Sequence, residues 1–140
     1  MRIKEVRAKS FVTIMIVIAL SALLLRITIE QVMRLTISQN ESNALSTLKL
    51  ISTSLENYAK DRQGHYPTNL TFLTSATPPY LDKDYITKFP VRGYTFNCAR
   101  LGETGYSCVA QPTKCRLTAN QVYTVTTGGS LTDEDCFKKD

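Results

Sequence analysis

The hydrophobic pattern of the chain changes at about residue 63. The run Phe11–Leu25 reads FVTIMIVIALSALLL and contains no charge, and the apolar pattern continues more sparsely to Met33. No glycine or proline occurs before Gly64, so nothing in this half of the chain interrupts a helix. The pattern predicts one long N-terminal helix that is apolar in its first part.

The second part of this helix is amphipathic. Apolar residues recur three or four positions apart and form one stripe: Leu45, Leu48, Ile51, Leu55 and Tyr58. The polar segment 38–43 lies between the two parts and has weak helix formers, so we expect the helix to bend or loosen there. Gly64, followed by Pro67, predicts the end of the helix.

The remaining residues, 64–140, form the predicted head. Alternating patterns predict strands over 93–98, 106–110 and 122–126, and Gly128-Gly129 predicts a turn before a tail over 131–137. Leu70, Phe72 and Leu73 are expected to point inward. The fold class is therefore α+β, with a long N-terminal helix, membrane-spanning in its first half and amphipathic in its second, packed on a small antiparallel sheet.

Four cysteines lie in the head and none in the helix. Their spacing does not suit zinc, whereas an even number suits two disulfides in an oxidising compartment. With Gly102-Glu103-Thr104 as a hairpin loop, Cys98 lies opposite Cys108, at a separation that suits a disulfide. This register predicts the pairs Cys98–Cys108 and Cys115–Cys136.

The net charge of +5 is concentrated at the N-terminus. Residues 1–10 carry four basic groups and one acid, whereas the head carries 8 basic and 7 acidic side chains. A nearly neutral head argues against nucleic-acid binding, and we expect no nucleic acid as a partner. A basic leader before an apolar helix instead predicts a cytoplasmic N-terminus.

The apolar helix has three possible explanations: a membrane anchor, a cleaved secretory signal and a buried core helix. A cleaved signal would end in small residues, yet Leu23, Leu24, Leu25 and Arg26 follow the run. The terminal position and the basic leader disfavour a core helix. We therefore expect a retained membrane anchor.

The residues provide little for catalysis. No nucleophile elbow, phosphate loop or dinucleotide motif occurs, and the single histidine, His65, lies in a predicted turn. We therefore expect no enzyme and no cofactor. Asp133 and Asp135 are weak candidates for calcium, with a solvated acidic turn as the alternative explanation.

The order of several short motifs resembles the type IV pilins, and especially the major pseudopilins of type II secretion systems. The resemblance covers the chain to about Phe96. It rests on the basic leader before Phe11, Leu55-x-x-Tyr58-x-x-Asp61, Gly64-x-Tyr66-Pro67-Thr68, Leu73, Pro79-Tyr80-Leu81, and Pro90 before Gly93-Tyr94-x-Phe96.

This resemblance implies a function and a processing site. A prepilin peptidase would cut between Ser10 and Phe11, Phe11 would be methylated, and subunits would assemble into a filament through their helices at an inner-membrane assembly platform. The chain would divide into a leader (1–10), a transmembrane or filament-core helix (11–29), an amphipathic continuation (30–63) and the head (64–140). It would cross the bacterial inner membrane once, with the head in the periplasm.

Two alternatives remain open from the sequence. The family usually has glycine before the cut and glutamate at the fifth mature position, where this chain has Ser10 and Met15. These residues leave the choice between major and minor subunit open and favour an alternative function, a monomeric periplasmic binding module held by an uncleaved anchor. A DNA-capturing pilin is a third possibility, disfavoured by the neutral head.

Overall fold

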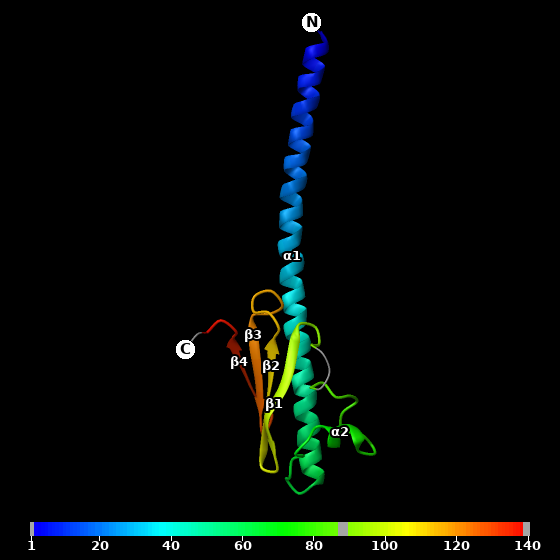
Figure 1. Cartoon of the computed structure of the whole chain (residues 1–140), viewed down its shortest axis with the longest axis vertical. Coiled ribbons are helices and arrows are strands. Elements are labelled where there is room, and N and C mark those ends of the chain that lie inside the picture. Colours follow the sequence, from blue (N-terminus) through cyan, green and yellow to red (C-terminus); the bar gives the residue numbers. More distant parts are fainter. Residues whose placement is uncertain (1, 87–89, 139–140) are drawn as a thin grey trace. The chain divides into compact units, whose positions relative to one another are not determined.

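The computed structural model describes residues 2–86 and 90–138, with side chains from Ser10 onward. The fold is α+β, as predicted, with one long helix and one antiparallel sheet (Figure 1). The elements in chain order are α1 (Arg2–Asp61), α2 (Thr71–Ser75), β1 (Tyr94–Gly102), β2 (Gly105–Pro112), β3 (Gln121–Thr126) and β4 (Ser130–Asp135).

The chain forms two compact units, Met1–Leu35 and Thr36–Asp140. Helix α1 contributes to both. Its first 34 residues (2–35) belong to the first unit, and residues 36–61 pack within the second unit against the sheet.

Helix α1 is continuous through the segment 38–43, so the prediction that it loosens there was wrong. Two polar side chains of this segment bond to the loop between β2 and β3. The Asn40 amide donates to the Thr118 carbonyl oxygen at 2.9 Å, and a Glu41 carboxylate oxygen accepts from the Asn120 backbone N–H at 2.8 Å. These contacts outweigh the weak intrinsic helix preference of the residues that make them.

The predicted helix end is confirmed. Helix α1 ends at Asp61, and the backbone N–H of Gly64 donates to the Ala59 carbonyl oxygen at 2.7 Å. Gln63 and Gly64 both have positive φ angles, 59° and 90°. Glycine takes this conformation without the steric cost of a Cβ atom, which explains the position of the first glycine in the chain.

The predicted stripe on α1 forms the helical side of the core. Leu48, Ile51 and Leu55 are fully buried, whereas Leu45 and Tyr58 are half-buried. The stripe also includes small residues that the hydrophobic pattern missed: Ala44, Ser52, Ser54 and Ala59. From the head, the core receives Leu70, Leu73, Leu81, Tyr94, Phe96, Tyr106, Cys108, Ala110, Ala119 and Val125.

One predicted inward anchor points outward. Leu70 and Leu73 are buried, but Phe72 in α2 is 50% exposed. Leu70, Phe72 and Leu73 cannot all face one direction, because residues two apart on a helix do not share a face.

The sheet is a four-stranded antiparallel meander in the order β1-β2-β3-β4. Cys98 pairs with Cys108 as predicted, but the hairpin between them differs from the prediction. The loop has two residues, Glu103 and Thr104, because Gly102 pairs with Gly105, and the register shifts by one residue at Ala99. This bulge returns Cys98 to the position opposite Cys108.

The predicted tail over 131–137 was wrong, because strand β4 occupies most of it. The turn at Gly128 and Gly129 is confirmed: both have positive φ angles, and Gly129 N–H donates to the Thr126 carbonyl oxygen at 3.0 Å. All six residues of β4 are exposed, including three acids. Charges on an edge strand of this kind oppose unwanted strand pairing.

Candidate functional site

The segment 11–25 of α1 carries no charge on any side of the helix and is exposed. The large apolar side chains between Phe11 and Leu35 are at least 40% exposed, and none of the apolar window is buried within the chain. A helix of a folded core would instead bury one stripe. Among the described residues, α1 is the one helix long and apolar enough to cross a membrane.

Hydroxyl groups in this segment satisfy their hydrogen bonds within the helix. Ser21 Oγ donates to the Val17 carbonyl oxygen and Thr28 Oγ1 donates to the Leu24 carbonyl oxygen, each at 2.7 Å. Such bonds to the carbonyl four residues earlier leave no donor unsatisfied in a hydrocarbon environment. The segment is therefore compatible with lipid despite its hydroxyl groups.

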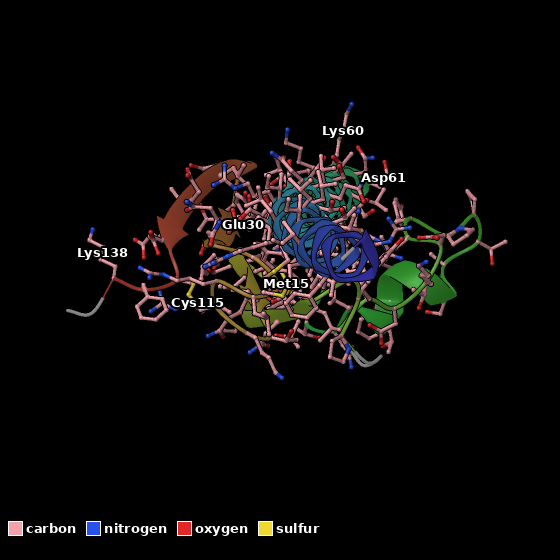
Figure 2. The ribbon with its side chains drawn as sticks, turned by 90° about the horizontal axis from the view of Figure 1, so that it is seen from above. Met15, Glu30, Lys60, Asp61, Cys115 and Lys138 are labelled. Atoms are coloured by element: carbon pink, nitrogen blue, oxygen red, sulfur yellow. A yellow bond between two sulfur atoms is a disulfide. The ribbon has the colours of Figure 1, made fainter. Side chains whose placement is uncertain are left out.

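The predicted processing residues lie in the same helix. Ser10 and Phe11 are both part of α1, and both are exposed. Met15, labelled in Figure 2, is also exposed and brings no charge to this region. Cleavage between Ser10 and Phe11 stays a prediction.

Both predicted disulfides are present. Cys98–Cys108 joins β1 to β2 with a Cα–Cα distance of 3.9 Å, and Cys115–Cys136 joins the loop after β2 to the residue that follows β4, with a distance of 5.9 Å. The second disulfide closes the C-terminal end of the sheet onto the loop that bonds to α1 through Thr118 and Asn120.

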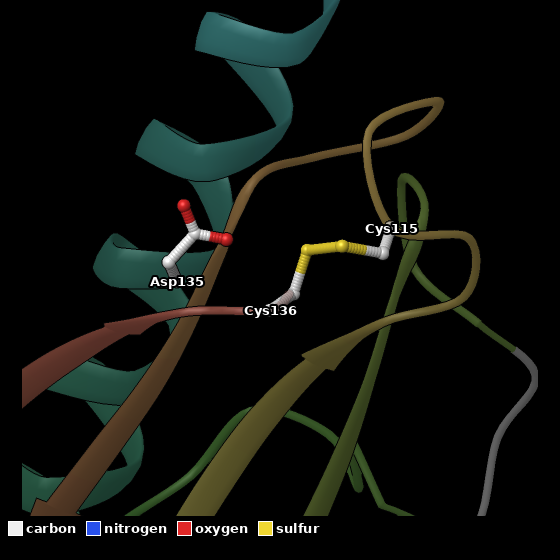
Figure 3. A group of neighbouring side chains, drawn as sticks. All are labelled: Cys115, Asp135 and Cys136. Atoms are coloured by element: carbon white, nitrogen blue, oxygen red, sulfur yellow. A yellow bond between two sulfur atoms is a disulfide. The ribbon is translucent and has the colours of Figure 1, made fainter. Parts of the chain in front are cut away.

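In the described part of the chain, the acidic side chains of β4 do not lie together as a group of three possible metal ligands. Among the described residues, the one group of three possible ligand side chains is Cys115, Asp135 and Cys136 (Figure 3). The two sulfur atoms are bonded to each other, so neither is available as a thiolate ligand. Asp135 accepts a hydrogen bond from Phe137 N–H at 2.9 Å, and Asp133 is exposed. Calcium binding by Asp133 and Asp135 stays a prediction.

A carboxylate that the sequence did not single out joins three parts of the second unit to α1. One oxygen of Glu56 accepts from the Tyr106 hydroxyl at 2.9 Å and from Gly128 N–H at 2.7 Å, and the other accepts from the Tyr66 hydroxyl at 3.0 Å. Glu56 thus fixes β2, the β3–β4 turn and the chain after α1 to one helix position. No sequence signal distinguishes it from a solvated glutamate on the polar face of a helix.

Tyr106 connects this network to the core. Its hydroxyl also contacts Ser52 Oγ at 2.8 Å, and its side chain is buried. Burial raises the pKa of Tyr106 to about 12; the hydrogen bond from Ser52 opposes this shift, and the Glu56 carboxylate adds to it.

Raised tyrosine pKa values predict alkaline unfolding of the second unit. Tyr106 keeps its proton in the folded chain up to pH about 12, whereas an unfolded tyrosine loses it near 10. Its contribution is therefore fully present below pH 10 and is lost between pH 10 and 12, by up to about 3 kcal/mol. Tyr106→Phe should reduce this alkaline slope in urea unfolding of the full chain in detergent. An unchanged slope would assign the alkaline transition to other groups.

Comparison of the chain with protein-family models, with curated proteins and with solved structures finds no match. The class of the protein therefore rests on its own fold and segments. It is an α+β protein with an exposed apolar N-terminal helix and a head held by two disulfides.

Proposed function

We propose that this chain is a structural subunit of a filament of the type II secretion pseudopilus or type IV pilus kind. One observation carries the proposal: the same helix α1 is apolar on all faces over 11–25 and buries a single stripe in the core of a folded head over 44–59. This division fits a subunit whose helix is held by lipid before assembly and by neighbouring helices afterwards.

Assembly through this helix needs no catalytic group. In the bilayer, lipid tails surround the side chains of Phe11–Leu25. In a filament, the helices of other copies replace the lipid and keep the same apolar surface away from water. The head remains outside the helical core, where its surface would determine contacts and spacing.

The proposed location follows from charge and cysteine chemistry. The basic leader supports a cytoplasmic N-terminus, because positive charge tends to stay on the cytoplasmic side of an inserted helix. The two disulfides suit an oxidising compartment, which supports a periplasmic location of the head. The proposed partners are further copies of the chain, a prepilin peptidase and an inner-membrane assembly platform.

Removal of the leader tests this proposal against the alternative of a tethered periplasmic module, which Ser10 and Met15 favour. We expect the chain isolated from membranes that contain a prepilin peptidase to begin at Phe11 and to carry a methyl group. Intact mass and the N-terminal peptide measure both changes, and membranes without the peptidase provide the matched control. A chain that keeps Met1–Ser10 in both membranes would favour the tethered module.

A further inference from the structure

Exposed basic and apolar side chains meet around the disulfide Cys115–Cys136. This disulfide joins the loop between β2 and β3 to the residues after β4. The Arg116 guanidinium lies over the Phe137 ring, with 4.3 Å between its central carbon and the ring centroid. Figure 2 labels Cys115 and Lys138 at the same edge of the head. We use the name basic-aromatic patch for five exposed residues of these two segments: Lys114, Arg116, Leu117, Phe137 and Lys138.

The composition of the basic-aromatic patch is typical of a surface that meets lipid headgroups. Phe137 and Leu117 are 56% and 54% exposed, and three long basic side chains lie in the same two segments. Aromatic and aliphatic side chains enter the boundary between headgroups and acyl chains, whereas lysine and arginine bind the phosphates above it. Asp135 adds one negative charge beside the patch, where its carboxylate accepts from Phe137 N–H at 2.9 Å. The three basic groups outnumber it.

The basic-aromatic patch lies at the end of the second unit where α1 enters. Asn40 and Glu41 of α1 bond to Thr118 and Asn120 of the same loop. If Phe11 lies at the cytoplasmic edge of the bilayer, a hydrocarbon core of about 30 Å takes up about 20 residues of helix, and the outer headgroups reach about residue 35. Asn40 follows about one and a half turns later. Only a short length of chain therefore separates the patch from the headgroups.

We propose that the basic-aromatic patch binds the anionic phospholipid surface of the membrane that α1 spans, and so holds the head against the bilayer before assembly. The cations bind lipid phosphodiesters, and the two apolar side chains enter the layer below them. This inference rests on the membrane location in the proposed function, but it does not require that the chain assembles into a filament.

A bilayer fits the basic-aromatic patch better than a folded protein partner does. Two exposed apolar side chains provide much less surface than the roughly 800 Å² per partner that a stable protein interface buries. A head on a membrane anchor needs less surface, because the anchor keeps the patch at a high effective concentration of lipid. A bilayer also presents many phosphates, so all three cations find a partner without a fixed register.

A single tryptophan tests this contact in the full chain. The chain contains no tryptophan, so Phe137→Trp introduces one fluorophore and keeps an aromatic ring beside Arg116. The variant is reconstituted into phosphatidylcholine vesicles, with or without phosphatidylglycerol, that carry a nitroxide quencher on headgroups of both leaflets. We expect quenching to be at least about twofold stronger with phosphatidylglycerol. Salt at about 1 M should remove this difference, because it screens the attraction.

A second tryptophan position provides the matched control. Phe72 in α2 is 50% exposed, close to the exposure of Phe137. It lies in a shallow cleft with Tyr58 and Arg62, near the end of α1 that is far from Asn40 in the second unit. We expect Phe72→Trp to show equally weak quenching in both lipid mixtures.

Neutral substitutions test the role of charge. Lys114→Gln with Lys138→Gln, introduced together with Phe137→Trp, should lower the ratio of bound to free head about 25-fold, since each cation near an anionic surface contributes about fivefold. Lys49→Gln with Lys60→Gln removes two exposed lysines of α1 in the second unit and should leave the quenching unchanged. Intact disulfides and protease resistance of the head control for folding.

The outcomes separate this inference from the proposed function. A chain that does not float with the vesicles would overturn the proposed membrane location and this inference with it. If the folded chain floats and Phe137→Trp is quenched no more than Phe72→Trp, only lipid binding by the patch fails. Equal quenching of Phe137→Trp in both lipid mixtures would overturn the role of anionic lipid. Burial of the fluorophore that depends on the number of chains per vesicle would assign the patch to contacts between copies instead.

Discussion

Leu24→Asp is expected to abolish membrane insertion and filament assembly together. Leu24 is 64% exposed near the end of the uncharged run, so its surface is covered by lipid or by another helix, according to the proposed function. An aspartate costs about 3 kcal/mol in insertion at the centre of a membrane helix, where Ile18 lies, and somewhat less toward its end, where Leu24 lies; no positive group lies in the run Phe11–Leu25 to offset this cost. Carbonate extraction and recovery in the sheared filament fraction measure the two effects. Ile18→Asp should behave in the same way.

The same helix provides a matched control. Asn57 is an exposed polar residue of α1 within the second unit, and Asn57→Asp adds one carboxylate there without placing it in the apolar segment. We expect this variant to insert and assemble normally. Normal filaments from Leu24→Asp would contradict the role of Phe11–Leu25, whereas a loss in both variants would indicate a general effect of added negative charge.

Leu48→Ala is expected to destabilise the second unit by about 3 to 5 kcal/mol. Leu48 is 0% exposed and lies in the stripe of α1 that faces the core. Removing a large side chain there loses its burial and leaves a cavity that the surrounding side chains fill only in part. Urea unfolding of the full chain in detergent, followed by protease sensitivity of the head, measures the change.

Leu50→Ala makes the same chemical change two residues further along. Leu50 is 42% exposed, so the truncation leaves no cavity, and we expect the stability to change by less than about 0.5 kcal/mol. Equal effects of the two substitutions would mean that the stripe does not form the helical side of the core.

Features carried by hydrophobic periodicity were predictable from the sequence. The burial of Leu48, Ile51 and Leu55 follows from a spacing of about 3.6 residues, and the apolar run is visible as a continuous stretch without charge. The pairing of Cys98 with Cys108 was predicted correctly from a hairpin that was not, because the bulge at Ala99 offsets the shorter loop. The stripe on α1 was predictable because it is one face that must be buried in the head. The prediction of the α+β fold followed from these patterns.

Structural features that do not depend on a buried apolar face could not be predicted from the sequence. Strand β4 is exposed on both sides, so its residues show no alternation, and only its pairing with β3 defines it. The bulge at Ala99 depends on the loop length chosen by the Glu103-Thr104 turn. Continuity of α1 at Asn40 and Glu41 depends on bonds to residues about 80 positions away, which local preference does not report.

The same distinction between local pattern and long-range contact applies to the candidate site. The uncharged segment is visible in the sequence, whereas the connection of α1 to the head through Glu56 is not. Its three hydrogen bonds join residues 10 to 72 positions apart, and a glutamate on a polar helix face has the same local pattern whether or not it makes them.

Electron microscopy of sheared fractions, with an antibody against the head, tests the central claim most directly. The account predicts antibody-labelled filaments from cells that contain the assembly platform and the prepilin peptidase, and their loss when Leu24→Asp replaces the unaltered chain. A head that is found only as a membrane-bound monomer, with unlabelled filaments beside it, would contradict the claim that this chain is a filament subunit.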